Sequence, residues 1–201
     1  GLPEAAGAPY LALVGGPQIA KSPGIRTYNP LLRRRRSALS YLAIQTGDLA
    51  TLLPLLEATG CVGLSVTMPL KDQALALADG DALARRLGAA NTLWPAAKGG
   101  WQASNTDVAG IEVPLSAHVA APARALVLGA GGAARAARAA CENLGLAVRL
   151  AARRGGDLGW AQRADDAPDV LINATPALEP WPADAPLPPL VFDTAIGVDN
   201  G

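Results

Sequence analysis

The chain is poor in the residues on which several common catalytic and metal sites depend. His118 is the only histidine among 201 residues. The sequence therefore offers little support for a histidine metal cluster or a Ser-His-Asp triad. The two cysteines, Cys61 and Cys141, lie in apolar surroundings without CxxC spacing. This usage favours a reduced cytosolic protein with buried thiols. We therefore expect no metal site and a cytoplasmic location.

An excess of one charge and long apolar runs are also missing. Lysine plus arginine number 17, as do aspartate plus glutamate, so we expect no molecule-wide field that would attract nucleic acid or an anionic membrane. The one basic block, Arg33 to Arg36, is interpreted as the exposed end of a helix rather than a nucleic-acid patch, because no second basic stretch extends it. No signal peptide is visible, and no uncharged apolar run approaches about 18 residues. We expect neither a nucleic-acid nor a membrane partner.

What the chain does contain is a regular alternation of short apolar runs and segments with helical spacing, which predicts an α/β fold. A boundary between two domains is expected near residues 117–125. Strands are predicted over residues 10–16, 37–45, 61–68, 125–128, 146–154, 168–176 and 189–197, with two more around the Lys98-Gly99-Gly100 turn. Helices are predicted from Ser22-Pro23, over 47–60 with Asp48 as a possible cap, over 71–88 with a break near Gly80, and from the glycine turn at 129 to Gly145.

A glycine motif follows the predicted strand at 125–128. The sequence "GAGGAA" supplies Gly129, Gly131 and Ala134 in a G-x-G-x-x-A pattern that opens an alanine-rich helix. Gly129 permits a tight turn, Gly131 lets the backbone approach a pyrophosphate, and Ala134 permits close helix–strand packing. The helix N-terminus stabilises the anion. The alternative is a flexible Ala/Gly linker. The motif predicts a dinucleotide-binding loop made of Gly129, Ala130, Gly131, Gly132 and Ala133.

The end of the next strand indicates which dinucleotide binds. An NAD site usually has an acid about 20 residues after the glycines, for the ribose hydroxyls. Here the stretch is "LAARRGG", which contains no acid but places Arg153 and Arg154 where a 2′-phosphate would lie. A guanidinium binds phosphate through two parallel hydrogen bonds. We infer NADP(H), with Arg153 the better candidate; the alternative is that both arginines face solvent.

A set of polar residues in the first half follows predicted strand ends. Lys71 comes after "SVTMPL", in which Pro69 ends the strand. Open α/β sheets bind ligands at this end, and a partly desolvated lysine can act in proton transfer. Taken alone, Lys71 is better explained as the start of a solvated helix, and Asp107 in "SNTD" as a helix N-cap. Together they form a candidate Lys-Asp pair that exchanges a proton with a carbonyl or alcohol.

The chain contains, in this order, the stretches "SVTMPLK", "GAANTL", "NTD", "LVLGAGGAARAA" and "INATP". With these stretches it resembles the shikimate dehydrogenase family. Their order and separation match as well. The resemblance implies a two-domain enzyme: an N-terminal α/β substrate-binding and catalytic domain over residues 1–117, and a Rossmann-like NADP-binding domain over residues 118–201. It implies that 3-dehydroshikimate plus NADPH gives shikimate plus NADP⁺, in the chorismate pathway of aromatic amino acid biosynthesis.

The resemblance also implies roles for individual residues. Lys71 matches the family's catalytic lysine and Asp107 its partner aspartate. The other matches are substrate and cofactor contacts: Asn91 and Thr67 for substrate hydroxyls, Ser22 for the substrate carboxylate, Gly129 to Ala134 for the diphosphate, Arg153 for the 2′-phosphate and Thr175 for the nicotinamide side.

The chain departs from the family pattern at several positions. Ala20 stands where the family has a serine, Ala152 where it has an asparagine, and Ile196 where it often has a tyrosine. Only fifteen residues lie between Arg153 and Asp169, and no C-terminal helices follow the last strand. Either the second domain is reduced or segments of the natural protein are omitted; we favour omission.

None of these departures falls at the Lys-Asp pair, and two of them, Ala20 and Ile196, fall at substrate positions of the family. Shikimate, quinate and an amino-substituted analogue of shikimate all stay open as substrates. A further alternative is an NADP-binding homologue without this catalysis that acts as a sensor or partner. We expect a small-molecule acid as the partner, and a monomer or homodimer.

Overall fold

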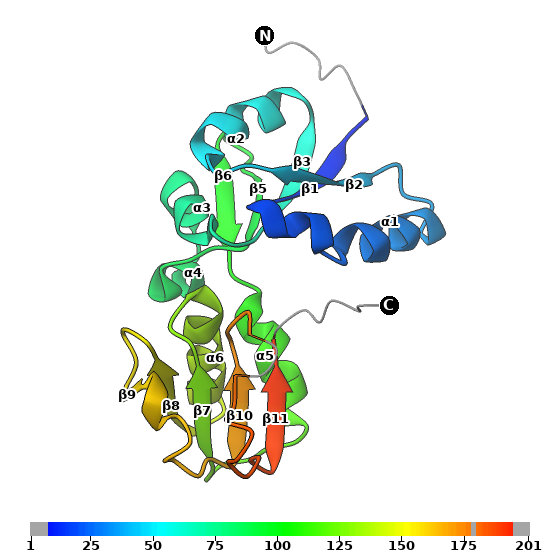
Figure 1. Ribbon diagram of the computed structural model, residues 1–201. Coiled ribbons are helices and arrows are strands. Elements are labelled where there is room, and N and C mark those ends of the chain that lie inside the picture. The colour runs from blue at the N-terminus through cyan, green and yellow to red at the C-terminus, as the bar shows by residue number, and fades with distance from the viewer. Residues whose placement is uncertain (1–7, 178–179, 195–201) are drawn as a thin grey trace. The chain divides into compact units, whose positions relative to one another are not determined.

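The computed structural model describes residues 8–177 and 180–194 and divides into two compact units, Gly1–Asn105 and Thr106–Gly201 (Figure 1). The units divide before helix α5 (Asp107–Ser116), whereas the sequence placed the domain boundary near Ala117. Helix α5 packs against helix α6 (Gly132–Asn143), and this packing groups it with the second unit. The expectation at Ile196 lies outside the described residues.

The first unit is built on a mixed sheet of six strands. Strand β1 is parallel to both of its neighbours, β2 and β3, whereas β5 runs antiparallel to β3 and β6. The strand order is β2 (Ser40–Gln45), β1 (Tyr10–Gly15), β3 (Cys61–Val66), β5 (Thr92–Pro95), β6 (Trp101–Ser104) and β4 (Asp79–Gly80).

Helices of the first unit begin and end largely where local chemistry predicts. The Asp48 carboxylate accepts a hydrogen bond from the Thr51 N–H at 3.2 Å, which confirms the expected cap. The predicted break near Gly80 is also present, because the two-residue strand β4 separates two helices. The helical elements are the 3₁₀ turn η1 (Pro17–Lys21), α1 (Gly24–Arg34), α2 (Leu49–Ala58), α3 (Lys71–Leu77) and α4 (Ala82–Leu87).

The arginine block lies where the sequence placed it. Arg33 and Arg34 form the last turn of α1, Arg35 is its C-cap, and Arg36 adopts a positive φ of 52°. All four side chains are exposed. The interpretation as an exposed helix end is therefore confirmed.

The second unit is a parallel sheet of five strands, with α6 following the glycine turn after its central strand (Figure 1). Alanines of α6, among them Ala136, Ala137 and Ala140, are fully buried, as expected for a helix that packs closely on a sheet. The α/β class with a Rossmann-like unit is confirmed. The order is β11 (Leu190–Asp193), β10 (Val170–Asn173), β7 (Arg124–Leu128), β8 (Ala147–Ala152) and β9 (Leu158–Gly159).

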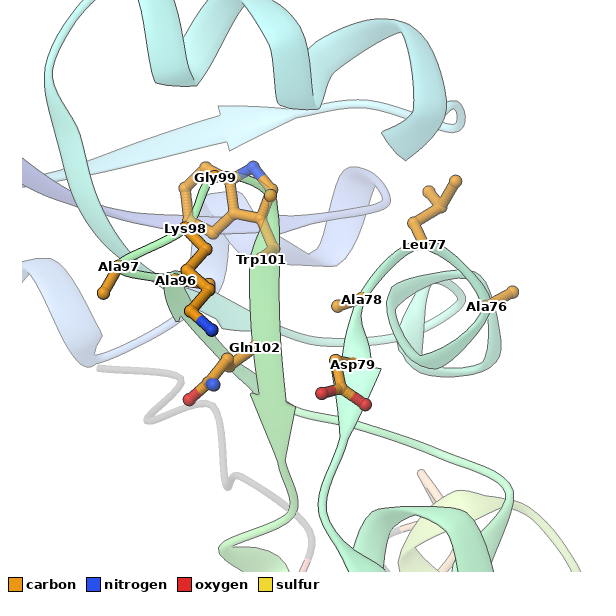
Figure 2. Close-up of a pocket in the computed structure, with 11 residues that line it drawn as sticks. Ala76, Leu77, Ala78, Asp79, Ala96, Ala97, Lys98, Gly99, Trp101 and Gln102 are labelled. Atoms are coloured by element: carbon orange, nitrogen blue, oxygen red, sulfur yellow. The ribbon is translucent and has the colours of Figure 1, made fainter.

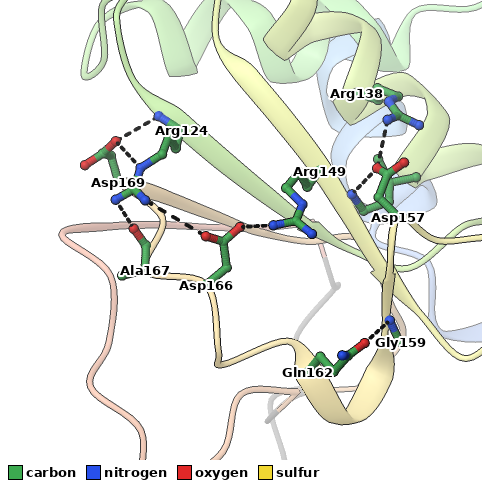
Figure 3. Close-up of polar contacts among 10 residues, drawn as sticks. Arg124, Arg138, Arg149, Asp157, Gly159, Gln162, Asp166, Ala167 and Asp169 are labelled. Atoms are coloured by element: carbon green, nitrogen blue, oxygen red, sulfur yellow. Dashed lines mark hydrogen bonds and ion pairs between the residues drawn. The ribbon is translucent and has the colours of Figure 1, made fainter.

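The short span after β8 is closed by β9 and the 3₁₀ turn η2 (Trp160–Gln162), without a further α-helix. Asp157 holds the start of this span, because its carboxylate accepts hydrogen bonds from the Leu150 N–H and from Arg138 Nη2, both at 2.8 Å (Figure 3). The span is thereby tied to β8 and to α6.

A second set of hydrogen bonds and ion pairs holds the end of the same span (Figure 3). Asp166 accepts from Arg149 Nη1 at 3.3 Å, and Asp169 accepts from the Arg124 backbone N–H at 2.8 Å. The Arg124 guanidinium also lies 3.9 Å from the Asp166 carboxylate. Exposed pairs contribute little singly, but together they fix both ends of the span to β7 and β8.

Among the described residues, no helix combines the length and the apolar character needed to cross a membrane.

Candidate functional site

Three predicted substrate and catalytic residues gather at the carboxyl end of β3. The Thr67 N–H donates to the Val14 carbonyl at 2.9 Å, which continues the β1–β3 pairing past the strand end. The Val66 N–H donates to the Asn91 carbonyl at 2.7 Å, and the Ala90 N–H donates to the Lys71 carbonyl at 2.9 Å. Backbone hydrogen bonds therefore bring Thr67, Lys71 and Asn91 together.

Lys71 is the first residue of α3, and its side chain is half-buried. It follows Leu70, which is fully buried and anchors the start of the helix. The Asn91 side-chain oxygen accepts from the Thr92 hydroxyl at 2.9 Å, and this bond orients the amide. Lys71 is thus neither a fully solvated lysine nor a buried one, as suits a group at the edge of a ligand site.

Gly15, at the end of β1, makes room for Thr67. A Cβ at Gly15 would overlap Thr67 Cγ2 and lie 2.7 Å from Ile19 Cγ2. Real Cβ atoms do not approach so closely, so a side chain here would displace Thr67. Gly15 is a positioning residue that the sequence did not single out; its signal was the "VGG" that ends the first apolar run.

Ser22 lies at the end of η1, where its hydroxyl accepts a hydrogen bond from the Gly24 N–H at 3.2 Å. The segment that leads into η1 is held against the loop after β3, because the Gly16 N–H donates to the Met68 carbonyl at 2.9 Å. Ala20, which replaces a polar residue of the family pattern, is exposed.

Asp107 is the first residue of α5, and the N-cap is Thr106. Asp107 is therefore the residue after the N-cap, and not the N-cap that the alternative interpretation of the sequence assigned to it. A carboxylate in the first turn is favoured by the helix dipole. Asp107 belongs to the second unit, whereas Lys71 belongs to the first.

The second unit contains a cavity of about 310 Å³ at the carboxyl ends of its strands. It brings together Gly129, Ala130, Arg153 and Thr175, all four of them predicted cofactor contacts. None of the residues that line it is acidic. The remaining lining residues are Ala152, Arg154, Trp160, Pro176 and Ala177.

The glycine turn has the geometry that its motif requires. Gly129 has a φ of +115°, and a Cβ there would lie 3.1 Å from the Ala174 carbonyl oxygen. Gly131 is the N-cap of α6 and offers no capping side chain, and a Cβ built on it would meet nothing within 4 Å. Gly132 and Ala133 are the first two residues of α6. This open, uncapped helix N-terminus suits a bound phosphate.

Arg153 and Arg154 directly follow β8, and both side chains are exposed while bordering the cavity. The Gly155-Gly156 pair that follows makes a tight turn. Gly155 has a φ of +71°, and a Cβ at Gly156 would lie 2.8 Å from the Ala152 N. Arg153 and Arg154 thus border the same cavity as Gly129 and Ala130 of the glycine loop, and no carboxylate lines that cavity.

Asn173 is a buried organiser of the loop after β10, and the sequence analysis did not identify it. Its side chain is 2% exposed. Its Oδ1 accepts from the Thr175 N–H at 3.0 Å and from the Thr175 hydroxyl at 2.7 Å. Its Nδ2 donates to the Ala177 carbonyl at 2.8 Å and to the Asp193 carboxylate at 3.0 Å. The polar "INATP" ending of an apolar strand was the signal for such a role.

A larger cavity, of about 740 Å³, lies in the first unit (Figure 2). It is bordered by the end of α3, strand β4 and the turn between β5 and β6, including Asp79, Lys98 and Trp101. These are the ends of α3 and β6 opposite to Lys71 and Asn91. None of the predicted site residues lines it, so size alone does not identify the substrate site.

The two cysteines are buried and unpaired. Burial raises the pKa of the Cys141 thiol to about 11, with a smaller contribution from Glu142, and burial also raises the pKa of Cys61. Both thiols therefore stay protonated at neutral pH. Within the described residues, no group of three or more histidine, cysteine or carboxylate side chains is placed to hold a metal ion.

Comparisons with known proteins point to one family. A family model for the "Shikimate dehydrogenase substrate binding domain" matches residues 14–93. The shikimate dehydrogenase (NADP(+)) of Aeropyrum pernix is 38% identical over 190 residues, which cover 83% of this chain and 68% of that protein. The enzyme of the same name from Acidiphilium cryptum is 41% identical over 148 residues, covering 71% of this chain and 53% of its own length.

Solved structures agree on the fold. Shikimate dehydrogenase 1 of Peptoclostridium difficile has a TM-score of 0.80 at 21% identity, covering 94% of this chain and 78% of its own. The shikimate dehydrogenase of Aquifex aeolicus has a TM-score of 0.77 at 25% identity, covering 90% of this chain and 73% of its own. A shikimate dehydrogenase solved in complex with NADP⁺ has a TM-score of 0.73 at 24% identity, covering 84% of this chain and 67% of its own. The chain spans 68% of the Aeropyrum relative and 53% of the Acidiphilium relative.

Proposed function

The chain belongs to the shikimate dehydrogenase family, and from this premise we propose that it is an NADP-dependent oxidoreductase. It interconverts 3-dehydroshikimate and shikimate, or a closely related cyclic polyol acid, as a step of aromatic amino acid biosynthesis. The observation that carries the proposal is the gathering of Thr67, Lys71 and Asn91 at one strand end by backbone hydrogen bonds.

Lys71 and Asp107 are the proposed proton-transfer pair. NADPH, when bound, supplies the hydride that reduces the substrate carbonyl to an alcohol. The Lys71 ammonium donates a hydrogen bond to the carbonyl oxygen and delivers a proton to it as the alcohol forms. Asp107 is the carboxylate that we assign to this proton transfer from the family resemblance. In the reverse direction the same pair removes the proton from the hydroxyl.

Thr67, Asn91 and Ser22 are the proposed substrate ligands. A threonine hydroxyl and an asparagine amide both donate and accept hydrogen bonds, so they suit the ring hydroxyls of the substrate. Ser22 holds the carboxylate. Ala20 removes one hydroxyl from that carboxylate site, which makes quinate and amino-substituted analogues of shikimate relevant test substrates.

The second unit supplies the cofactor site, with NADP(H) preferred over NAD(H). The support is a cavity that joins Gly129, Arg153 and Thr175 and that no carboxylate lines. We assign the diphosphate to the loop of Gly129, Ala130, Gly131, Gly132 and Ala133, and the 2′-phosphate to Arg153. Isothermal titration with NADPH and NADH tests this assignment. A preference for NADH would overturn it.

Turnover tests the proposed reaction. The full chain is assayed by NADPH absorbance with 3-dehydroshikimate in one direction, and with NADP⁺ plus shikimate or quinate in the other. The proposal expects turnover of at least one of these acids. An amino-substituted analogue of shikimate belongs in the same panel.

A second candidate function is an NADP-binding homologue that serves as a sensor or partner without this catalysis. The exposed Ala20, where the family pattern has a serine, favours it. Tight NADPH binding with no turnover of any acid in the panel would support this function over the first.

We also propose a cytoplasmic location and a monomeric or homodimeric state. The buried, unpaired Cys61 and Cys141 support a reducing compartment. Size-exclusion chromatography with light scattering measures the oligomeric state.

A further inference from the structure

Trp160 borders the proposed cofactor cavity without having a place in the glycine motif or the arginine pair. It is the first residue of η2, directly after β9, and its side chain is half-buried. Aromatic residues make up only 4% of the chain. An indole at the border of a nucleotide cavity is therefore a specific feature of this chain.

Arg163 fixes the orientation of this indole. The Arg163 Cζ lies over the Trp160 ring, 4.8 Å from its centroid. The same guanidinium donates from Nη1 to the Trp160 carbonyl at 2.9 Å and from Nε to the Pro180 carbonyl at 2.7 Å. The indole is thus held in place by a cation–π contact before any ligand arrives, and a preorganised surface loses less entropy on binding.

The segment that carries Trp160 is tied down along its length. Leu158 and Gly159 pair with Ala151 and Ala152 of β8. The Gly159 N–H donates to Gln162 Oε1 at 3.2 Å, which closes η2 (Figure 3). The short span after β8 therefore presents Trp160 from a fixed position.

The order of the proposed phosphate sites identifies the part of the dinucleotide that reaches Trp160. The diphosphate is assigned to the loop between β7 and α6, and the 2′-phosphate to Arg153 and Arg154 after β8. In the sheet, β9 is the next strand beyond β8, and Trp160 follows it. Adenine is attached to the ribose that carries the 2′-phosphate, so it lies on this side of the cavity, whereas nicotinamide lies across the diphosphate.

We propose that Trp160 is the platform on which the adenine ring of the dinucleotide stacks, with Arg163 holding the indole in place. The inference rests on the proposed NADP-dependent function and names the residue that recognises the base. The flat apolar face of an indole stacks on a purine without needing hydrogen bonds. The connection between β8 and β10 in this unit is short, and stacking on Trp160 provides the recognition of the base.

Adenosine 2′,5′-bisphosphate is the probe, because it carries the base and the 2′-phosphate but no nicotinamide. Its affinity is measured by isothermal titration for the wild-type chain, Trp160→Phe, Trp160→Leu and Trp94→Leu. We expect Trp160→Leu to bind about five- to 150-fold more weakly, the range that base–aromatic stacking supplies. Trp160→Phe keeps a ring face and stays within a few-fold of wild type. Trp94→Leu, at a tryptophan of the first unit, is unchanged.

Tryptophan fluorescence is a second measurement, which the probe would not change if Trp160 had only a structural role. The probe quenches the wild-type emission, and this quenching is lost in Trp160→Phe although the probe still binds. Equal affinity of wild type and Trp160→Leu would overturn the stacking inference while leaving the NADP assignment intact. Failure of the wild-type chain to bind the probe at all would overturn both.

Discussion

Replacing Asn173 by alanine tests whether one buried amide organises the cofactor loop. The substitution deletes two acceptor and two donor interactions at a side chain that is 2% exposed. It leaves the Thr175 N–H and hydroxyl, the Ala177 carbonyl and the Asp193 carboxylate without this partner. An unsatisfied buried polar group costs about 1–3 kcal/mol. Thr175 is half-buried and Ala177 exposed, so water replaces part of the loss, and we expect a total of about 2–4 kcal/mol.

The free energy of unfolding is measured by urea denaturation of the full chain, followed by circular dichroism. Asn143→Ala is the matched control, because the exposed Asn143 makes a single 2.8 Å hydrogen bond to Glu112 at the surface. The control should change the free energy of unfolding by less than about 0.5 kcal/mol. A loss of similar size in Asn173→Ala would refute the reasoning, because the four hydrogen bonds would then contribute nothing beyond an exposed one.

Asn173→Asp separates the donors from the acceptor of the same side chain. An aspartate retains an oxygen for Thr175 but places a carboxylate beside Asp193. Two carboxylates in contact raise the pKa of one of them. The variant should therefore be less stable than wild type at neutral pH, and the difference should narrow as the pH falls toward about 5 and one carboxyl takes up a proton. A pH-independent difference would contradict this account.

Three further predictions concern catalysis, packing and pH. Lys71→Ala should lower kcat about 10²–10⁴-fold with little change in NADPH affinity, while Lys98→Ala in the β5–β6 turn stays at wild-type turnover; near wild-type turnover of the first variant would remove Lys71 from the mechanism. Gly15→Ala should destabilise the chain by about 1–3 kcal/mol in urea denaturation, because the new Cβ overlaps Thr67, and an unchanged midpoint would contradict the overlap. Burial raises the pKa of the Cys141 thiol from 9.0 to about 11 in the folded state, so the protonated thiol stabilises the fold below pH 9 and this contribution is lost as the pH rises through 11. Between pH 9 and pH 11, the free energy of unfolding of the wild type should therefore fall by roughly 2–3 kcal/mol more than that of Cys141→Ala. An equal pH dependence of the two free energies would contradict this prediction.

Features that depend on a few neighbouring residues were predictable from the sequence. The Asp48 cap, the helix end at Arg33 to Arg36 and the glycine turn at Gly129 each follow from local backbone chemistry. The interactions that stabilise these features all lie within one or two turns of the chain. The position of Lys71 after a strand belongs to the same class, although β3 ends at Val66 and Pro69 lies in the turn that follows it.

Other features required contacts between distant segments. The grouping of α5 with the second unit depends on its packing against α6, which no local pattern encodes. The sequence alone does not distinguish Asn173 from other polar residues, because its role depends on its hydrogen bonds to Ala177 and Asp193.

The residues of this chain by themselves determined its longer strands, its glycine loop and the chemistry available at the ends of those strands, but not the two-residue strands β4 and β9. The features determined in this way depend on period-two and helical spacing and on capping and turn propensities. All of these act over short distances along the chain, so they can be recognised without knowledge of the fold. Only the tertiary structure decided which strand ends meet: Thr67 with Lys71 and Asn91, and Arg153 with Thr175 and Trp160. Strand order and long-range hydrogen bonds set those meetings, and they arise from the packing of the whole sheet rather than from any single stretch of sequence.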